Sequence, residues 1–473
     1  MKVTQVAIRP SEASVQAGRP ALTPELLAAT GARYSRNNEG LESILTKIDP
    51  SNLDKSVDSI FRMIDYGHQS IADMVPVSMF IDDVSIWLAY YIWTLCPTAG
   101  GQESSTRYIK ISSDGLIPPG DLGIPDDYAS EWRHLMDECF RAYSEALALW
   151  ENLATADPSL LGIPRSLLSD GSETAQKKVA RMKRNYGFDR ARYFLPVAAA
   201  TNLMLVMSAR GWVSLCQHLL SHFLPEANRL GQKIRAELEL AAPRMVKHAR
   251  DISSVRSGIL QDFERLSAKA NTITSLCLTS NEDNEAPVIP FLETLPPKGT
   301  TDADFAEDLA VHDSRYAWVG SSLHRTAVRF GWSAVSFAEI RDLNRHRTGS
   351  KHSPQIPQGF YCATDRLPDY LRKADPVRTM LRQLAAAGAT ACAKEHALLQ
   401  ARKPWYVYWS VLGTQYPFEH TTTADKFIYE AELRTGVGAH FRYAQHLRDI
   451  LALWRQQSPA TATLILEGTA EPE

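Results

Sequence analysis

The stretch Arg345-His346-Arg347-Thr348-Gly349-Ser350 (RHRTGS) is the most distinctive in this chain of 473 residues. It places two guanidinium groups and an imidazole in three consecutive positions, which is poor material for a core because buried cations need partners. Arginine offers a planar fork of donors suited to phosphate or carboxylate, and Gly349 and Ser350 would permit a tight turn and add a hydroxyl donor. The stretch is therefore either a solvated basic loop or a site for an anion or a cofactor.

A second polar stretch is Gln102-Glu103-Ser104-Ser105-Thr106-Arg107-Tyr108 (QESSTRY). If it is extended, Glu103, Ser105 and Arg107 project to one side of the strand. That side would offer a carboxylate, a hydroxyl and a guanidinium, which together can hold a nucleotide by its sugar hydroxyl and its phosphate. The alternative is the polar edge of a hairpin.

Three shorter stretches also contain candidate residues. In Arg190–Pro196 (RARYFLP), Arg192 precedes a Leu-Pro break and lies either on the surface or in a pocket. In the late helical stretch Glu432–Thr435, Arg434 could simply pair with Glu430 one turn earlier. Gly67–Ser70 (GHQS) can be read as a simple turn.

Composition limits the class of protein. Apolar residues make up 44% and charged residues 22% of the chain, as in soluble globular proteins, and the length allows two or three domains. The net charge is −3 and there is no long basic run, so nucleic acid is not indicated as a partner. Any bound anion must then be held by local arginines instead of an overall positive field.

The six cysteines are scattered, without a Cys-x-x-Cys pair or a zinc-like spacing. We therefore expect structural thiols in a reducing cytoplasm and no metal site. The N-terminus lacks the apolar core of a signal peptide, and the longest apolar stretch, Val84–Cys96, is too short to span a bilayer. These features predict a cytoplasmic protein with no membrane partner.

Hydrophobic periodicity predicts an α+β fold with long helices packed on a small mixed or antiparallel sheet. Apolar residues recur at helical spacing from Trp132 to Trp150. Strand-like patterns are fewer, at Val75–Ile81 and Tyr406–Leu412. The periodicity fades between residues 251 and 304, which are rich in Pro, Asp, Asn and Thr in places, and we place a linker there.

The linker separates a first domain (residues 1–250) from a second domain (residues 305–473). Each has an apolar segment that ends in Val-Ser, at Val84-Ser85 and Val335-Ser336, and that leads through a helix into a polar motif. Pattern alone leaves open whether the two domains arose by duplication.

Taken together, these stretches resemble the flavin-dependent thymidylate synthases, also called thymidylate synthase complementing proteins. The signature of that family is Arg-His-Arg-x-x-Ser followed by Asn-Glu-x-Ser-x-Arg-Tyr, with Gly-His-x-Ser before it and Ala-Arg-x-x-Leu-Pro after it. Here the signature is split. The first domain keeps Gly67–Ser70, Gln102–Tyr108 and Ala191–Pro196, but has Leu95-Cys96-Pro97 where Arg-His-Arg belongs.

The second domain shows the reverse pattern. It keeps Arg345–Ser350 and the late Arg434, but Ser353, Gln355 and Pro357 stand where Glu, Ser and Arg belong. The losses are complementary, as expected for a tandem version in which each domain has specialised. The family is known as a homotetramer with active sites between subunits, so the resemblance implies a homodimer that forms a pseudo-tetramer.

The resemblance also implies an activity: reductive methylation of dUMP to dTMP with methylenetetrahydrofolate as carbon donor, FAD as hydride carrier and NADPH as reductant. Arg192 and Arg434 would face the pyrimidine carbonyls and act catalytically by stabilising negative charge. The remaining nucleotide-binding residues would be Glu103, Ser105, Thr106, Arg107 and Tyr108. The cofactor-binding residues would be His68, Ser70, Arg345, His346, Arg347 and Ser350.

One departure from the family concerns Asp342, which stands three residues before Arg345, where the family usually has glutamine. It places an anion near the proposed phosphate. Other possible functions are a flavoenzyme of the same fold acting on another pyrimidine nucleotide such as UMP, and a non-catalytic protein that binds nucleotide or flavin. A structural helical protein with coincidental motifs is a further alternative.

Overall fold

The computed structural model describes most of the chain, in nine segments: residues 1–9, 11–36, 40–49, 51–65, 69–161, 169–273, 284–371, 376–436 and 438–468. The chain forms two compact units. Unit 1 comprises Met1–Ser104, Ile117–Pro125 and Ala199–Glu264, and unit 2 comprises Ser105–Leu116, Asp126–Ala198 and Arg265–Glu473. Each unit therefore combines separate stretches of sequence, and the units do not follow the ranges 1–250 and 305–473.

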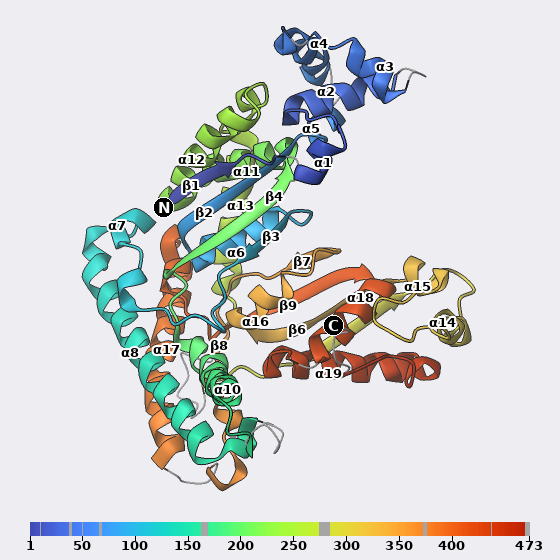
Figure 1. Cartoon of the computed structure of the whole chain (residues 1–473). Helices are drawn as coiled ribbons and strands as arrows, with labels where there is room; N and C mark the ends of the chain where they lie inside the picture. Colours follow the sequence, from blue (N-terminus) through green and yellow to red (C-terminus); the bar gives the residue numbers. More distant parts are fainter. Residues whose placement is uncertain are drawn as a thin grey trace. The chain divides into compact units, whose positions relative to one another are not determined.

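Unit 1 contains a four-stranded antiparallel sheet with the strand order β1-β2-β4-β3 (Figure 1). Along β2, the side chains of Val77, Met79 and Ile81 are buried while Phe80 is largely exposed, so the strand predicted at Val75–Ile81 is confirmed. The strands are β1 (Lys2–Val6), β2 (Pro76–Ser85), β3 (Gly100–Glu103) and β4 (Ala200–Ser208).

Helices α11 and α12 pack against each other beside this sheet, and α12 also contacts β1. The apolar stretch at Val84–Cys96 forms the buried helix α6. The helices of unit 1 are α1 (Glu12–Gln16), α2 (Pro24–Tyr34), α3 (Leu41–Thr46), α4 (Leu53–Asp65), α5 (Ser70–Asp73), α6 (Ile86–Leu95), α7 (Pro119–Leu122), α11 (Ala209–Ser221), α12 (Pro225–Ala241) and the 3₁₀ turn η4 (Val246–His248).

Unit 2 contains a second antiparallel sheet, with the order β5-β6-β9-β7 and with β8 paired to β9. Its strands are β5 (Pro290–Leu295), β6 (Ala327–Ser336), β7 (Ser350–His352), β8 (Gly359–Phe360) and β9 (Thr414–Thr423). Helix content and two small antiparallel sheets make the protein α+β, as the sequence predicts.

Long helices complete unit 2, and Figure 1 shows α8 and α17 running side by side. Helix α8 buries Trp132, Met136, Tyr143 and Trp150 on one face, which confirms the predicted helix. The helices are α8 (Asp126–Ala156), α10 (Glu173–Ala191), α14 (Asp302–Asp308), α15 (Ser321–Arg325), α16 (Phe337–Leu343), α17 (Pro376–Gln400), α18 (Ala424–Thr435) and α19 (Phe441–Gln457).

Short 3₁₀ helices connect these elements: η1 (Ser113–Gly115), η2 (Pro158–Leu161), η3 (Arg192–Phe194), η6 (Thr364–Arg366), η7 (Asp369–Leu371), η8 (Pro404–Trp409) and η9 (Pro459–Thr461). The strand predicted at Tyr406–Leu412 is wrong, because most of that segment is η8. The linker predicted over residues 251–304 also contains regular structure, namely α13 (Ser253–Ala270) and β5.

The two sheets share one plan. The pairing of β2 with β4 shifts between Ile81 and Val84, and the pairing of β6 with β9 shifts between Trp332 and Val335. In each case the long strand then ends in a serine that is the N-cap of the next helix, Ser85 for α6 and Ser336 for α16.

This plan gives a position-by-position correspondence between the units. Ile81 pairs with Leu203 and Trp332 with Phe418, so the two bulges align Leu203 with Phe418. Three residues further along those strands, Val206 pairs with Gly100 and Thr421 pairs with Ser350. Gly100 thus corresponds to Ser350. With the same offset, Leu95-Cys96-Pro97 takes the sequence positions that correspond to Arg345-His346-Arg347.

Within unit 2, the segment around Arg192 pairs with the segment around η8. Pro196 and Val411 form an antiparallel bridge. The amide of Val197 donates to the carbonyl of Ser410 at 3.1 Å, and the amide of Leu412 donates to the carbonyl of Leu195 at 2.9 Å. These reciprocal bonds fix the backbone that carries Arg192. In the described part of the chain, no helix has both the length and the apolar character needed to cross a membrane.

Candidate nucleotide site

Arg192 follows helix α10 and is almost fully buried, with 1% of its surface exposed. Its Nη2 donates to Oδ2 of Asp342 at 3.0 Å and lies 3.9 Å from Oε1 of Glu339. The hydroxyl of Tyr193 donates to the same Glu339 oxygen at 2.8 Å. Arg192 is therefore a buried guanidinium held by carboxylates, and the surface interpretation of this residue is wrong.

Asp342 lies near the end of α16, and its side chain is only 16% exposed. Burial acts to raise the pKa of Asp342, but the guanidinium groups of Arg192, Arg107 and Arg434 outweigh it and hold that pKa below its usual range. The carboxylate is thus ionised at neutral pH and interacts with three arginines at once.

Arg107 forms a two-pronged ion pair. Its Nε donates to Oδ1 of Asp189 at 2.7 Å and its Nη2 donates to Oδ2 at 2.9 Å. Such fork-to-fork geometry is the arrangement in which arginine also binds phosphate. The donors predicted to hold a phosphate are therefore engaged with a carboxylate on α10.

Arg434, on helix α18, contacts His346 instead of Glu430. Its Nε donates to Nε2 of His346 at 2.6 Å, and its Nη2 donates to the backbone carbonyl of Asp342 at 3.2 Å. The guanidinium also lies over the ring of Tyr443, 5.2 Å from the centroid. The proposed pairing of Arg434 with Glu430 is thus replaced by an imidazole contact.

His346 must be neutral to accept this hydrogen bond. Burial and the neighbouring charge of Arg434 lower the pKa of His346 to about 3, although Glu430 acts in the opposite direction. Because Nε2 accepts from Arg434, the ring proton is assigned to Nδ1. For the same reason Glu430 Oε1, 3.8 Å from that nitrogen, does not form an ion pair with His346.

These contacts define an arginine cluster within unit 2. It brings together two residues from motifs of the first half of the chain and two from the second half, in addition to two aspartates. We use the name for Arg107, Arg192, Arg434, Asp189, Asp342 and His346. Residues separated by more than 300 positions along the sequence thus share one electrostatic environment.

Two contacts of Asp189, one with Arg107 and one with His440, were not apparent from the sequence. Asp189 lies 82 residues from Arg107, and nothing in the motif identifies it as a partner. His440 fixes the same region, because its Nε2 faces the carbonyl of Asp189 at 3.0 Å while its Nδ1 accepts from the amide of Arg442 at 3.2 Å. One signal in the sequence indicated the partner of Arg107, namely the acidic residue Asp189 directly before Arg190-Ala191-Arg192.

The RHRTGS stretch forms the turn between α16 and β7. Gly349 adopts a φ of +67°, and a Cβ at this position would overlap the carbonyl oxygen of Thr421, so the predicted tight turn is confirmed. Nε2 of His420 faces the carbonyl of Thr348 at 2.7 Å. Arg347 and Ser350 are exposed and Arg345 is half-buried, so this turn is solvated at Arg347 and Ser350 but not at His346.

The QESSTRY stretch is extended only as far as Glu103, the last residue of β3, and a turn follows. The hydroxyl of Ser105 accepts from the amide of Arg107 at 3.2 Å, and the carbonyl of Ser105 accepts from the amide of Ile109 at 3.2 Å. The expectation that Glu103, Ser105 and Arg107 project to one side of a strand is therefore wrong. Thr106 is buried within this turn, whereas Tyr108 is 57% exposed.

Of the remaining predicted residues, Glu103 and Ser70 belong to unit 1. Glu103 accepts a hydrogen bond from the indole Nε1 of Trp93 at 3.1 Å. Ser70 is exposed at the start of α5. His68 lies outside the described residues.

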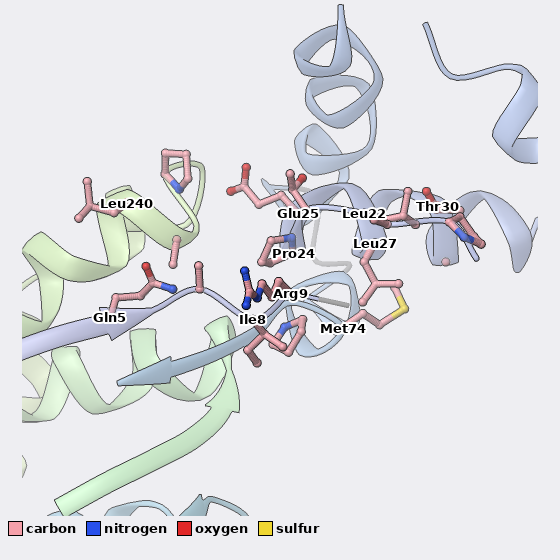
Figure 2. A pocket seen from close by; sticks show the side chains of 18 of the residues that line it. Gln5, Ile8, Arg9, Leu22, Pro24, Glu25, Leu27, Thr30, Met74 and Leu240 are labelled. Atoms are coloured by element: carbon pink, nitrogen blue, oxygen red, sulfur yellow. The ribbon is translucent and has the colours of Figure 1, made fainter. Parts of the chain in front are cut away.

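Unit 1 also contains a cavity of about 1150 Å³ beside the end of β1, shown in Figure 2. Its wall is largely apolar, and Ile8, Leu27, Met74 and Leu240 contribute to it. Glu25 at its edge is paired with Arg244. None of the predicted site residues that the structure describes lines this cavity.

Comparison with known proteins gives matches over part of the chain and over most of it. Residues 21–244 match the sequence model of the family described as thymidylate synthase complementing protein. The UPF0159 protein Ta1429 of Thermoplasma acidophilum is 24% identical over 467 residues, which cover 89% of each protein. A flavin-dependent thymidylate synthase of Clostridium tetani is 21% identical over 227 residues, covering 48% of this chain and 82% of that protein.

A similar relation holds for the flavin-dependent thymidylate synthase of Geobacter sulfurreducens, with 22% identity over 189 residues, 40% of this chain and 65% of that protein. Among solved structures, the UMP/dUMP methylase PolB from Streptomyces cacaoi, bound with 5-Br dUMP, matches with a TM-score of 0.29 and 16% identity. That match covers 52% of this chain and 93% of the other.

Proposed function

Because residues 21–244 of this chain match the sequence model of the thymidylate synthase complementing protein family, we propose that the protein is a flavin-dependent enzyme that methylates a pyrimidine nucleotide. The first candidate reaction is the conversion of dUMP to dTMP. The observation that carries this proposal is the arginine cluster, which unites Arg107 and Arg192 from one part of the split signature with His346 and Arg434 from the other.

In this proposal each arginine has a distinct part in nucleotide binding. Arg107 presents the fork that would take the phosphate, after exchanging its present partner Asp189. Arg192 and Arg434 would donate to the pyrimidine carbonyls. Negative charge develops there when C5 becomes nucleophilic, and preorganised donors in a buried site stabilise such charge strongly.

His346 would hold Arg434 in place within this site. Its neutral imidazole accepts a hydrogen bond from Nε of Arg434. The two outer nitrogens of that guanidinium are therefore not used in binding the imidazole. This arrangement supports a role for His346 beside the nucleotide, in place of direct contact with the flavin predicted from the sequence.

The donor chemistry of the RHRTGS turn fits an anionic cofactor such as FAD. Arg347 and Ser350 are exposed on a turn whose backbone passes close to β9, and they offer a guanidinium and a hydroxyl suited to a diphosphate. Arg345 is a further candidate in this turn, and Ser70 and His68 stay candidates from the sequence alone. When bound, FAD would deliver the hydride, with methylenetetrahydrofolate as carbon donor and NADPH as reductant.

The repeated plan of the two sheets supports the tandem interpretation of the chain. At the position of Arg345-His346-Arg347, unit 1 has Leu95-Cys96-Pro97, which offers no side-chain cation. We therefore propose that each half supplies a different part of the site, and that two chains associate as a homodimer.

Release of tritium from dUMP labelled at C5 tests this function. We expect purified protein with FAD, NADPH and methylenetetrahydrofolate to release tritium in a folate-dependent manner, because methylation must replace the C5 hydrogen. Arg192→Ala should lower the rate by about 10²-fold, since it removes a preorganised donor. Arg329→Ala is the matched control, because Arg329 is a half-exposed arginine whose ion partners are Glu293 and Glu419.

Folate-independent release, or equal loss in both variants, would contradict the proposal. A parallel reaction with UMP labelled at C5 distinguishes the two pyrimidine substrates. Bound FAD without release from either nucleotide would indicate a binding protein.

A further inference from the structure

Asp342 contacts two of the three arginines of the arginine cluster. It accepts from Nη2 of Arg192 at 3.0 Å, and its own backbone carbonyl accepts from Nη2 of Arg434 at 3.2 Å. Arg107 also contributes to its low pKa. Asp342 lies in the last turn of α16, where the negative end of the helix dipole adds to its charge.

The other two acidic side chains nearby, Asp189 and Glu339, do less to balance the charge of Arg192. Asp189 is fully engaged by Arg107 through both of its oxygens. Glu339 lies 3.9 Å from Arg192 and accepts from Tyr193 and Ser336, and burial raises its pKa. Asp342 is therefore the main counter-charge of Arg192.

The negative charge of Asp342, which balances the positive charge of Arg192, opposes the binding of an anion at the arginine cluster. A phosphate held by Arg107 would lie in the field of the Asp342 carboxylate, which interacts electrostatically with Arg107, and would be repelled by it. An amide in place of the carboxylate would leave the hydrogen-bonding shape similar but remove one negative charge, so the net positive charge of the three arginines and two aspartates would increase.

We propose that Asp342 is a specificity-determining residue that sets the ligand charge accepted by the arginine cluster, and that it restrains the binding of nucleotide monophosphates. This inference rests on the proposed function, because it treats the cluster as the nucleotide site. Asp342 acts through Arg192 and Arg434 and is a positioning residue, not a catalytic one.

The test compares Asp342→Asn with wild type by calorimetric titration of dUMP and, separately, of inorganic phosphate. We expect Asp342→Asn to bind both ligands at least about 10-fold more tightly, from the loss of one unit of repulsion at a partly buried site. Asp342→Glu keeps the charge and should show no gain. Asp365→Asn is the matched control, because Asp365 pairs with Arg442 elsewhere in unit 2.

The possible outcomes separate the inference from the proposed function. A gain for phosphate without any binding of dUMP would support the role of Asp342 and contradict the nucleotide site. Unchanged affinity for both ligands in a folded Asp342→Asn protein would overturn the role of Asp342. If this variant is unstable, phosphate should raise its melting temperature more than that of wild type, and no such rescue would also overturn the inference.

Discussion

At the scale of single residues, buried neutral histidines make the stability of this fold depend on pH. His222 is buried against Trp87, Tyr91 and Phe223, and its Nδ1 accepts from the amide of Leu224 at 3.0 Å. Burial lowers the pKa of His222 to about 4. His440 has the same arrangement at the start of α19, with its pKa also lowered by burial. A proton on Nδ1 of His440 would remove the acceptor that caps α19, and a proton on Nδ1 of His222 would break its bond to the amide of Leu224.

We predict that stability falls between pH 6.5 and about pH 4, partly because of His222. In this window the unfolded chain binds a proton that the folded His222 does not, so stability is complete above pH 6.5 and decreases as pH falls. At pH 5 the loss from this residue should reach about 2 kcal/mol. Thermal melts of wild type and His222→Asn at pH 7 and pH 5 check this, since asparagine can accept the same backbone bond.

The variant should lose less stability than wild type between the two pH values. His134→Asn serves as control because the His134 side chain is 76% exposed. If the stability of wild type and of His222→Asn depends on pH in the same way, His222 does not contribute to the loss of stability at low pH.

At the scale of elements, the RHRTGS turn was the best-predicted local structure. The sequence indicated a tight turn at Gly349 because glycine adopts left-handed conformations without strain, and the structure has φ +67° there. The helix from Trp132 to Trp150 was equally readable from its apolar spacing. Local signals of this kind need no knowledge of distant contacts.

Substitution of Gly349 should destabilise unit 2 more than the left-handed backbone alone requires. We expect Gly349→Ala to cost more than about 2 kcal/mol, because strain adds to the overlap of the new Cβ with the carbonyl of Thr421. Gly299→Ala is the matched control: Gly299 has φ +87° with nothing within 4 Å of a Cβ, so its cost should be about 1 kcal/mol. Urea unfolding measures both, and equal costs would contradict the close approach of this turn to β9.

Long-range pairing was the part of the site that the sequence did not predict. The motifs identified Arg107, Arg192, Arg434 and His346 as residue types, but not their partners. The ion pair of Arg107 joins positions 82 apart, and the bond between Arg434 and His346 joins positions 88 apart. The turn after Glu103 was also missed, because it depends on a hydroxyl bond to the backbone that a polar stretch does not reveal.

At the scale of the whole molecule, one chain contains both parts of the split signature, which flavin-dependent thymidylate synthases carry on a single continuous stretch. The net charge of −3 leaves no general attraction for a nucleotide, so in the proposed function capture would depend on the local arginines. The structure places those arginines within one unit of one chain. The prediction of a homodimer is separate from this point, because this chain does not need a partner to assemble the cluster.

The central claim is therefore that the arginine cluster is completed within a single chain, and mixing two inactive variants tests it most directly. Arg107→Ala and Arg434→Ala should each lose nucleotide-dependent tritium release. The two proteins would be co-expressed with different tags, and mixed assemblies would be isolated by both tags. The account predicts that mixed assemblies stay inactive, because every chain has a damaged cluster. Recovery of activity to roughly a quarter or more of the wild-type level would mean that the two arginines meet across chains, and would contradict it.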